Sequence, residues 1–243
     1  MPRSTLHRAA VSTIAAVAAT ALLAGCGGTT TPTPEAATPG AQCAGTAPSV
    51  VPVVPPSTDN DATSTMVMVI RHGEKPDGEE PGLDATGNAD DSSMTKVGWD
   101  RAHALVGLFD PAQGALRPGL ARPTAIYAAG ANEDGEGQRT RETVEPLSGR
   151  LGVTTDTRYG KGDEEELVEH VLSQPGPTLI SWAHSEIPAI AEAFPSVTPT
   201  PPSEWEEDRF DVIWTFTKTP DGWHFAQLPE LVLPQDKPDI IED

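Results

Sequence analysis

The apolar residues of this chain form short runs that alternate with amphipathic stretches, a pattern typical of strands separated by helices. Met66–Ile70 is a run of five apolar residues bounded by polar sequence, which indicates a strand buried on both faces. Thr124–Ala129 and Thr178–Ala183 are two more predicted strands. Because helix-like stretches lie between the strands, the pattern predicts an α/β sheet that is mostly parallel and carries helices on both faces.

The helical stretches are recognised by their spacing and by their end signals. The first is predicted to begin after Thr95, a good N-cap residue, with Leu105 and Phe109 on its buried face. Pro146 lies inside the second helix and is expected to kink or shorten it. The further predicted helices cover Gln138–Leu151, Glu164–Leu172 and a short segment from Ser185 through Phe194.

The C-terminal part of the chain predicts a hairpin that closes the sheet. Apolar residues occupy every second position, a Pro-Asp-Gly turn follows, and the chain returns as a second strand. These residues are Phe210, Val212, Trp214 and Phe216, then Pro220-Asp221-Gly222, then Trp223–Gln227. The Pro-rich, acidic sequence beyond them is expected to end in a flexible tail over residues 235–243.

The N-terminal segment has the composition of a signal peptide. Within residues 1–25, Arg3 and Arg8 precede an apolar stretch that is too short to span a bilayer. Leu23-Ala24-Gly25-Cys26 resembles the lipobox of bacterial lipoproteins. The resemblance implies cleavage before Cys26 and a lipid on its sulfur, so that the exported protein is held on the extracytoplasmic face of the cell membrane. A plain signal peptide is the alternative.

Residues 26–63 are expected to form a disordered tether, because Pro, Thr and Ala dominate this segment and it has few large apolar residues that could form a core. Cys43 lies in this tether and has no intrachain partner once Cys26 carries lipid. Residues 64–234 remain, enough for one domain with a single core.

Charge restricts the partners of this chain. It has 16 Lys and Arg against 36 Asp and Glu, a formal net charge of −20, and loss of Arg3 and Arg8 with the signal leaves 14 against 36, or −22. Such a chain repels nucleic acid and anionic membrane surfaces. An anionic ligand therefore needs a local positive patch, for which the candidates are Arg71, Lys75, Arg139 and Arg141.

Two of the predicted strands end in histidine. Arg71, His72 and Gly73 directly follow the first strand, and His184 follows the strand that begins at Thr178. If these strands are parallel, both imidazoles lie at the sheet edge where ligands of α/β proteins bind. An arginine fork matches phosphate oxygens, and a neutral histidine nitrogen can accept a phosphoryl group. The structural alternative is that Arg71 pairs with a surface carboxylate and His72 closes a turn.

Arg139 opens the predicted second helix. The helix dipole opposes a cation at this end, whereas an anion there would be held by the guanidinium and by the free N–H groups of the first turn. The sequence contains no metal-ligand spacing, so no metal or other cofactor is expected.

These motifs together resemble the histidine phosphatase superfamily over Thr65–Gln227. The resemblance implies a three-layer, doubly wound α/β fold of the phosphoglycerate-mutase type. The motifs, in the family's order, are Arg71-His72-Gly73-Glu74, Met94-Thr95 with Gly98, Arg139 with Thr143, and His184-Ser185.

The resemblance also implies roles for the site residues. His72 would become phosphohistidine, with Arg71, Arg139 and His184 around the phosphoryl oxygens and water hydrolysing the intermediate. The proton donor departs from the family's pattern. The acid-phosphatase branch has a carboxylic acid directly after the second histidine, where this chain has Ser185 and then Glu186. The mutase branch has a mid-chain glutamate, near Glu164 here. We favour Glu186.

The implied function is hydrolysis of a small phosphomonoester by an exported, lipid-anchored protein. A lipoprotein that binds phosphorylated ligands without turnover is the alternative, and a phosphomutase is a third, disfavoured because phosphorylated glycolytic substrates are cytoplasmic. Two acidic, glycine-rich loops, Asp77–Ser93 and Gly130–Gly137, are expected to set the specificity. Neither the substrate nor the oligomeric state follows from these residues.

Overall fold

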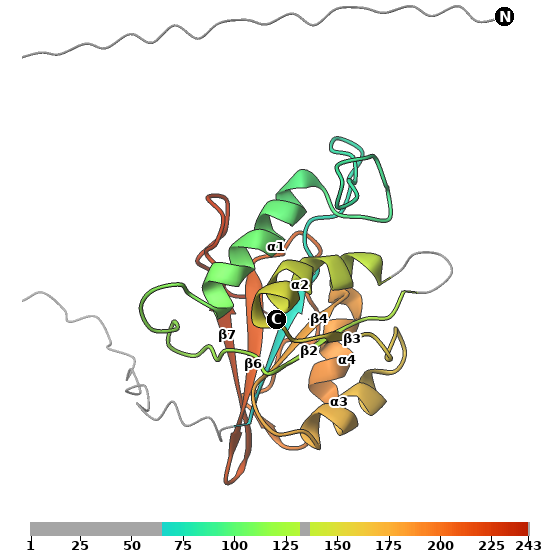
Figure 1. The fold of residues 1–243 in the computed structure, drawn as a ribbon. Coiled ribbons are helices and arrows are strands. Elements are labelled where there is room, and N and C mark those ends of the chain that lie inside the picture. Colours follow the sequence, from blue (N-terminus) through green and yellow to red (C-terminus); the bar gives the residue numbers. More distant parts are fainter. Residues whose placement is uncertain (1–64, 132–136, 243) are drawn as a thin grey trace, which may run out of the picture. The chain divides into compact units, whose positions relative to one another are not determined.

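The computed structural model describes residues 65–131 and 137–242. In this part of the chain, seven strands form one sheet in the order β3-β2-β4-β1-β6-β7-β5 (Figure 1). Four neighbouring pairs are parallel, and only β6 runs antiparallel to its neighbours β1 and β7. The prediction of a mostly parallel α/β sheet is confirmed. The strands are β1 (Met66–Arg71), β2 (Ala125–Ala128), β3 (Thr155–Asp156), β4 (Thr178–Trp182), β5 (Val197–Thr198), β6 (Val212–Thr219) and β7 (Gly222–Pro229).

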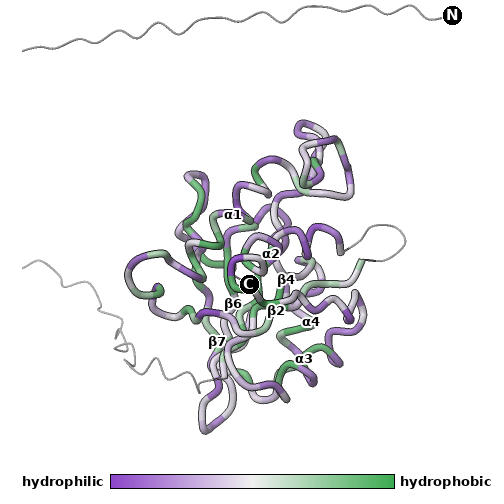
Figure 2. The backbone as a smooth tube through the Cα atoms, in the orientation of Figure 1, coloured by the Kyte–Doolittle hydropathy of each residue, from purple (hydrophilic) through white to green (hydrophobic). Residues whose placement is uncertain are grey.

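Helices cover both faces of this sheet, which confirms the three-layer architecture. They are α1 (Lys96–Phe109), α2 (Gln138–Leu151), α3 (Glu164–Leu172) and α4 (Ile187–Glu192), the last preceded by the 3-10 turn η1 (His184–Glu186). Side chains of β1 alternate between the faces. Met68 and Ile70 share a core with α1 and α2, whereas Val67 and Val69 share one with α3 and α4. Figure 2 shows the hydrophobic residues gathered on the strands and on the helix sides that face them.

The ends of two helices follow the sequence signals. Thr95 caps α1, its Oγ1 accepting a hydrogen bond from Gly98 N at 3.3 Å. Helix α2 runs through Pro146 to Leu151, so the proline does not shorten it. None of the helices in the described ranges is long and apolar enough to cross a membrane. The predictions for the signal, the lipid site and the tether lie outside the described residues.

The C-terminal tail is packed onto the domain, so the expectation of a flexible tail is wrong for residues 235–242. Ile241 is only 1% exposed and belongs to the core on the α3–α4 face. The side chain of Gln227 exchanges hydrogen bonds of 2.8 and 3.2 Å with the main chain of Ile241. Asp236 pairs with the buried Arg101 at 2.8 Å. The buried arginines of the domain need hydrogen-bond acceptors, and the tail provides some of them. The composition of the tail does not reveal these contacts.

Arg101 joins this tail to the strand-end motif. Its guanidinium contacts three carboxylates, those of Glu74, Glu230 and Asp236, at 2.7 to 2.8 Å. The pKa of Glu230 is raised to about 8, mainly by burial. The negative charges of Asp236 and Glu74 also raise it, whereas the positive charge of Arg101 lowers it. Glu74, the fourth residue of the Arg-His-Gly-Glu motif, therefore fixes the motif to α1 through an ion pair.

Candidate functional site

The register of two parallel strands brings the two strand-end histidines together. In the β1–β4 pair Arg71 lies opposite Trp182, and His72 N donates to Trp182 O at 3.0 Å. His72 is therefore the first residue beyond β1, and His184 is the second residue beyond β4. Both line one cleft of about 870 Å³, at the sheet edge where ligands of α/β proteins bind.

His72 has the properties of a neutral nucleophile. Its side chain is buried, and Nδ1 lies 2.8 Å from Gly73 O, which can only accept a hydrogen bond. The pKa of His72 is lowered to about 3, mainly by burial. The charges of Arg71, Arg139 and His184 act in the same direction, and the hydrogen bond to Gly73 acts against them. At neutral pH the proton is on Nδ1, so the lone pair is on Nε2.

His184 adds a second neutral imidazole. Burial lowers its pKa, as do the positive charges of Arg71 and Lys75. Its Nδ1 is buried and has no hydrogen-bond partner among the described residues. An oxygen atom brought into the cleft could supply the missing partner.

Arg139 lies at the second position of α2 and lines the same cleft. Its Nη1 donates to Ser92 O at 3.2 Å and more weakly to Asp91 O at 3.4 Å, so the acidic loop before α1 holds the guanidinium. Thr143 joins this helix start to the motif. Its Oγ1 accepts from Gly73 N at 2.8 Å and donates to Arg139 O at 2.7 Å.

Arg71 is fully buried and is not among the residues that line the cleft. Its Nη1 donates to Glu207 O at 2.5 Å and to Arg209 O at 3.0 Å, and its guanidinium stacks 3.6 Å from the ring centroid of Phe210. Nε and Nη2 have no partner among the described residues. Burial lowers the pKa of Arg71 to about 10, so it stays charged at neutral pH. Nε and Nη2 form the side of the guanidinium that can bind two oxygens of one anion.

The two candidate proton donors do not line the cleft, and the carboxylate of each is already bound by neighbouring groups. The carboxylate of Glu186 lies 2.7 Å from Lys161 Nζ and accepts from Ser185 Oγ at 3.1 Å. The buried Glu164 accepts from Trp182 Nε1 and from Gly162 N, each at 3.0 Å. The partners of both glutamates line the cleft, but neither glutamate does.

Four cationic side chains line the cleft, and three of them pair with carboxylates outside its lining, those of Glu207, Asp156 and Glu186. Arg139, Lys75, Arg158 and Lys161 line it, and none of its described lining residues is a carboxylate. Of the residues expected to form a local positive patch, Lys75 and Arg139 line this cleft. Arg141 was also a candidate, but it lines a separate depression at the other end of α2.

Phe210, Arg158 and Lys161 were not identified from the sequence. Phe210 continues the apolar alternation of β6 in the sequence, but β6 begins only at Val212. The ring of Phe210 packs on the guanidinium of Arg71. The two cations follow β3, a strand of two residues that gives no periodic signal. Within the described ranges, no group of three or more His, Cys, Asp or Glu side chains could hold a metal ion.

Comparisons with known proteins give distant structural likenesses. No model of a known protein family matches the sequence, and no curated protein matches it. A mycobacterial glucosyl-3-phosphoglycerate phosphatase in complex with VO3 matches with a TM-score of 0.42 and 14% identity, over 66% of this chain and 96% of that chain. A protein proposed to be the phosphohistidine phosphatase SixA of Nakamurella multipartitia matches with a TM-score of 0.40 and 13% identity, over 68% and 95%.

A third solved structure, of a protein proposed to be an α-ribazole-5′-phosphate phosphatase of Escherichia coli, matches with a TM-score of 0.41 and 11% identity, over 68% of this chain and 96% of that chain. With identities this low, we base the functional assignment on the geometry of the cleft.

Proposed function

We propose that this chain is a histidine-type phosphatase that hydrolyses a small phosphomonoester through a phosphohistidine on His72. The observation that carries the proposal is the buried, neutral imidazole of His72, which lines one cleft with His184 and Arg139. Its pKa of about 3 keeps the ring neutral at physiological pH, and the contact of Nδ1 with Gly73 O leaves the lone pair on Nε2. The unpaired donors of Arg71, whose charge acts on both imidazoles, support the same conclusion.

The proposed chemistry is two successive phosphoryl transfers. Nε2 of His72 attacks phosphorus, the bond between phosphorus and the ester oxygen breaks, and the leaving oxygen takes a proton. Water then attacks phosphorus, the N–P bond breaks, and His72 and inorganic phosphate are released. Arg71, Arg139 and His184 are proposed to hold the phosphoryl oxygens, because such reactions depend mainly on positioning and on neutralising spread charge. No metal or other cofactor is assigned a step.

Glu186 remains our proposed proton donor. It lies on the turn that begins with His184, and its two partners, Ser185 and Lys161, line the cleft. To act it would have to exchange its contact with Lys161 for the leaving oxygen. Glu164 is less suitable, because Trp182 and Gly162 already hold its carboxylate.

The test is hydrolysis of an aryl phosphate by the full chain, together with trapping of an acid-labile phosphoenzyme. His72→Ala should abolish the phosphoenzyme and lower kcat/KM by about a thousandfold or more, since it removes the nucleophile. His103→Ala is the matched control, because that histidine is exposed on α1 and contacts Trp99 of the same helix. Full activity in His72→Ala would refute the mechanism.

The binding alternative is favoured by one observation, that neither candidate proton donor lines the cleft. A binding protein would retain inorganic phosphate, measured by calorimetry, without forming a phosphoenzyme or releasing product. A mutase would return the phosphoryl group to a second hydroxyl instead of to water. Product analysis with a diol monophosphate distinguishes these outcomes from hydrolysis.

A further inference from the structure

Within the described residues, the guanidinium of Arg71 is held by main-chain carbonyls and by an aromatic ring. Its acceptors belong to Glu207 and Arg209, with a weaker contact to Glu206 at 3.4 Å. All of these bonds use Nη1. Phe210 covers one flat face of the guanidinium. The segment 205–211 therefore fixes both the plane and the rotation of Arg71 and leaves Nε and Nη2 unpaired.

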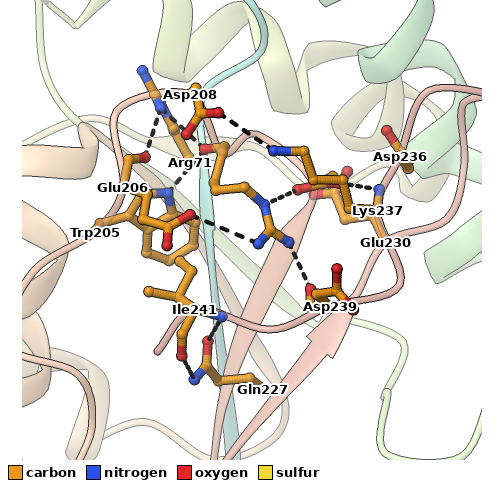
Figure 3. A network of polar contacts seen from close by, with 12 residues as sticks. Arg71, Trp205, Glu206, Asp208, Gln227, Glu230, Asp236, Lys237, Asp239 and Ile241 are labelled. Atoms are coloured by element: carbon orange, nitrogen blue, oxygen red, sulfur yellow. Dashed lines mark hydrogen bonds and ion pairs between the residues drawn. The ribbon is translucent and has the colours of Figure 1, made fainter. Parts of the chain in front are cut away.

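The segment 205–211 is in turn held by the C-terminal residues (Figure 3). Arg209 is buried, donates from Nε to Asp211 at 2.8 Å and from Nη2 to Asp239 O at 2.6 Å. Its own carbonyl, which accepts from Arg71, also accepts from Trp205 Nε1 at 2.9 Å. Lys237 N donates to the second oxygen of Asp211 at 2.6 Å. A continuous set of hydrogen bonds thus runs from the tail to Arg71.

The other buried arginines show what a purely structural role looks like in this molecule. Every nitrogen of the Arg101 guanidinium bonds to a carboxylate. Arg209 bonds through Nε and Nη2 and lies 3.9 Å from the Glu206 carboxylate through Nη1. Arg71 is as deeply buried as these two, yet two of its nitrogens are unsatisfied, which is costly in a protein interior. An oxyanion is the ligand that would satisfy both nitrogens at once.

We propose that segment 205–211 and the tail 236–241 form a brace that orients Arg71 toward the phosphoryl group, with Phe210 and Arg209 as positioning residues. The inference rests on the proposed function and adds a regulator of phosphate affinity that lies outside the cleft lining. The brace accepts the hydrogen bonds of Nη1, so that Nε and Nη2 of Arg71 point in a fixed direction before the ligand binds.

The first test replaces Phe210 by leucine, which keeps apolar volume and removes the aromatic face. Phe210→Leu in the full chain should weaken binding of inorganic phosphate, measured by calorimetry, by up to about tenfold, the range of a partly buried cation–π contact. KM for an aryl phosphate should rise in parallel. Phe225→Leu is the matched control, since Phe225 is a buried core residue of β7 without contact to Arg71, and it should leave phosphate affinity unchanged.

A double-mutant cycle separates positioning from general loss of stability. Arg71→Ala should itself reduce phosphate affinity by about a hundredfold, because a charged donor pair is lost. In the Arg71→Ala background, Phe210→Leu should have no further effect on affinity. Additive losses would overturn the brace, because they would mean that Phe210 acts by a route other than Arg71.

The second test loosens the tail by a substitution outside segment 205–211. Ile241→Ala should weaken phosphate binding severalfold, whereas Ile126→Ala, an equally buried truncation on β2, should lower only the thermal midpoint. Equal phosphate affinities in these two variants would overturn the role of the tail. If the parent chain neither binds phosphate nor hydrolyses the aryl phosphate, the proposed function fails and the brace with it. If the parent does both and the variants match their controls, only the brace fails.

Discussion

A histidine that attacks phosphorus must keep a free lone pair, and His72 achieves this by burial. The neutral ring is favoured because a charged imidazole would be placed beside Arg71 and Arg139 without solvent. Gly73 O then determines which nitrogen carries the proton. The same features that keep the lone pair of His72 free therefore make its protonation costly.

This cost predicts a specific dependence of stability on pH. The pKa of His72 falls from 6.5 in the unfolded chain to about 3 in the folded domain. Since the unfolded chain binds the proton more readily, the free energy of unfolding decreases as the pH falls from about 6.5 towards 3. At pH 4.5 the loss should be on the order of 2–3 kcal/mol relative to pH 7.

Urea unfolding of the parent and of His72→Asn at pH 7 and pH 4.5 measures this loss. The variant lacks the titrating group, so its unfolding free energy should decrease by less between the two pH values, by the same 2–3 kcal/mol. Identical pH dependence in the two proteins would contradict the assigned state of His72.

The residues of the site differ in how well the sequence revealed them. His72, His184 and Arg139 could be identified because each lies where an element begins or ends, and periodicity marks those positions. Arg71 was identified too, although its partners were not, because its carbonyl acceptors and Phe210 come from a segment more than a hundred residues away. The proton donor could not be chosen, since side-chain direction in a turn has no sequence pattern.

Among the elements, α1 depends on a close approach to the strand-end motif. A Cβ at Gly98 would lie 2.8 Å from Glu74 O and 2.9 Å from Glu74 N. A Cβ at Gly73 would meet Met94 Sδ at 2.7 Å and Gly98 O at 2.9 Å. Two glycines therefore let the helix pack directly on the backbone that carries His72.

Two substitutions within this one helix test that packing. Gly98→Ala should lower the free energy of unfolding by about 2 kcal/mol or more, because backbone must move to admit the methyl group. Gly107→Ala should raise it by up to about 1 kcal/mol, since Gly107 is exposed on the same helix and nothing lies within 4 Å of the new atom. Thermal or urea unfolding measures both, and similar effects of the two changes would contradict the model of close approach.

Element prediction succeeded where a segment was long enough to show a period. The bounds predicted for α2 and α3 match the structure. Those for β1 and β4 differ from it by one residue at one end, and those for β2 by one residue at each end. β3 and β5 have two residues each and could not be found, because tertiary pairing alone defines them. The tail was mistaken for a flexible segment because its order comes from contacts to Arg101, Arg209 and Gln227 rather than from local propensity.

At the scale of the whole molecule, the strongly negative chain opposes the approach of an anion, and the cations of the cleft act against that field over a short distance.

An exported protein on a tether would meet its substrate outside the cytoplasm. We therefore retain the proposal, made from the sequence, that the chain is exported and lipid-anchored through Cys26.

Metabolic labelling tests the anchor. Cells that express the full chain should incorporate radiolabelled fatty acid into the protein, and Cys26→Ala should abolish the label and release the protein from the membrane fraction. Cys43→Ala is the matched control, because it removes the only other cysteine and should change neither result. Label that persists in Cys26→Ala would contradict the anchor.

The pairing of β1 with β4 has a consequence for how such a site tolerates change over evolution. The separation of the His72 and His184 imidazoles depends on the main-chain register between β1 and β4. Most side chains inside both strands are therefore free to vary among apolar residues. Insertion or deletion of one residue in either strand, however, would shift one imidazole by about 3.3 Å and turn it to the opposite face. Such a site can diverge widely in sequence while the lengths of these two strands stay constant.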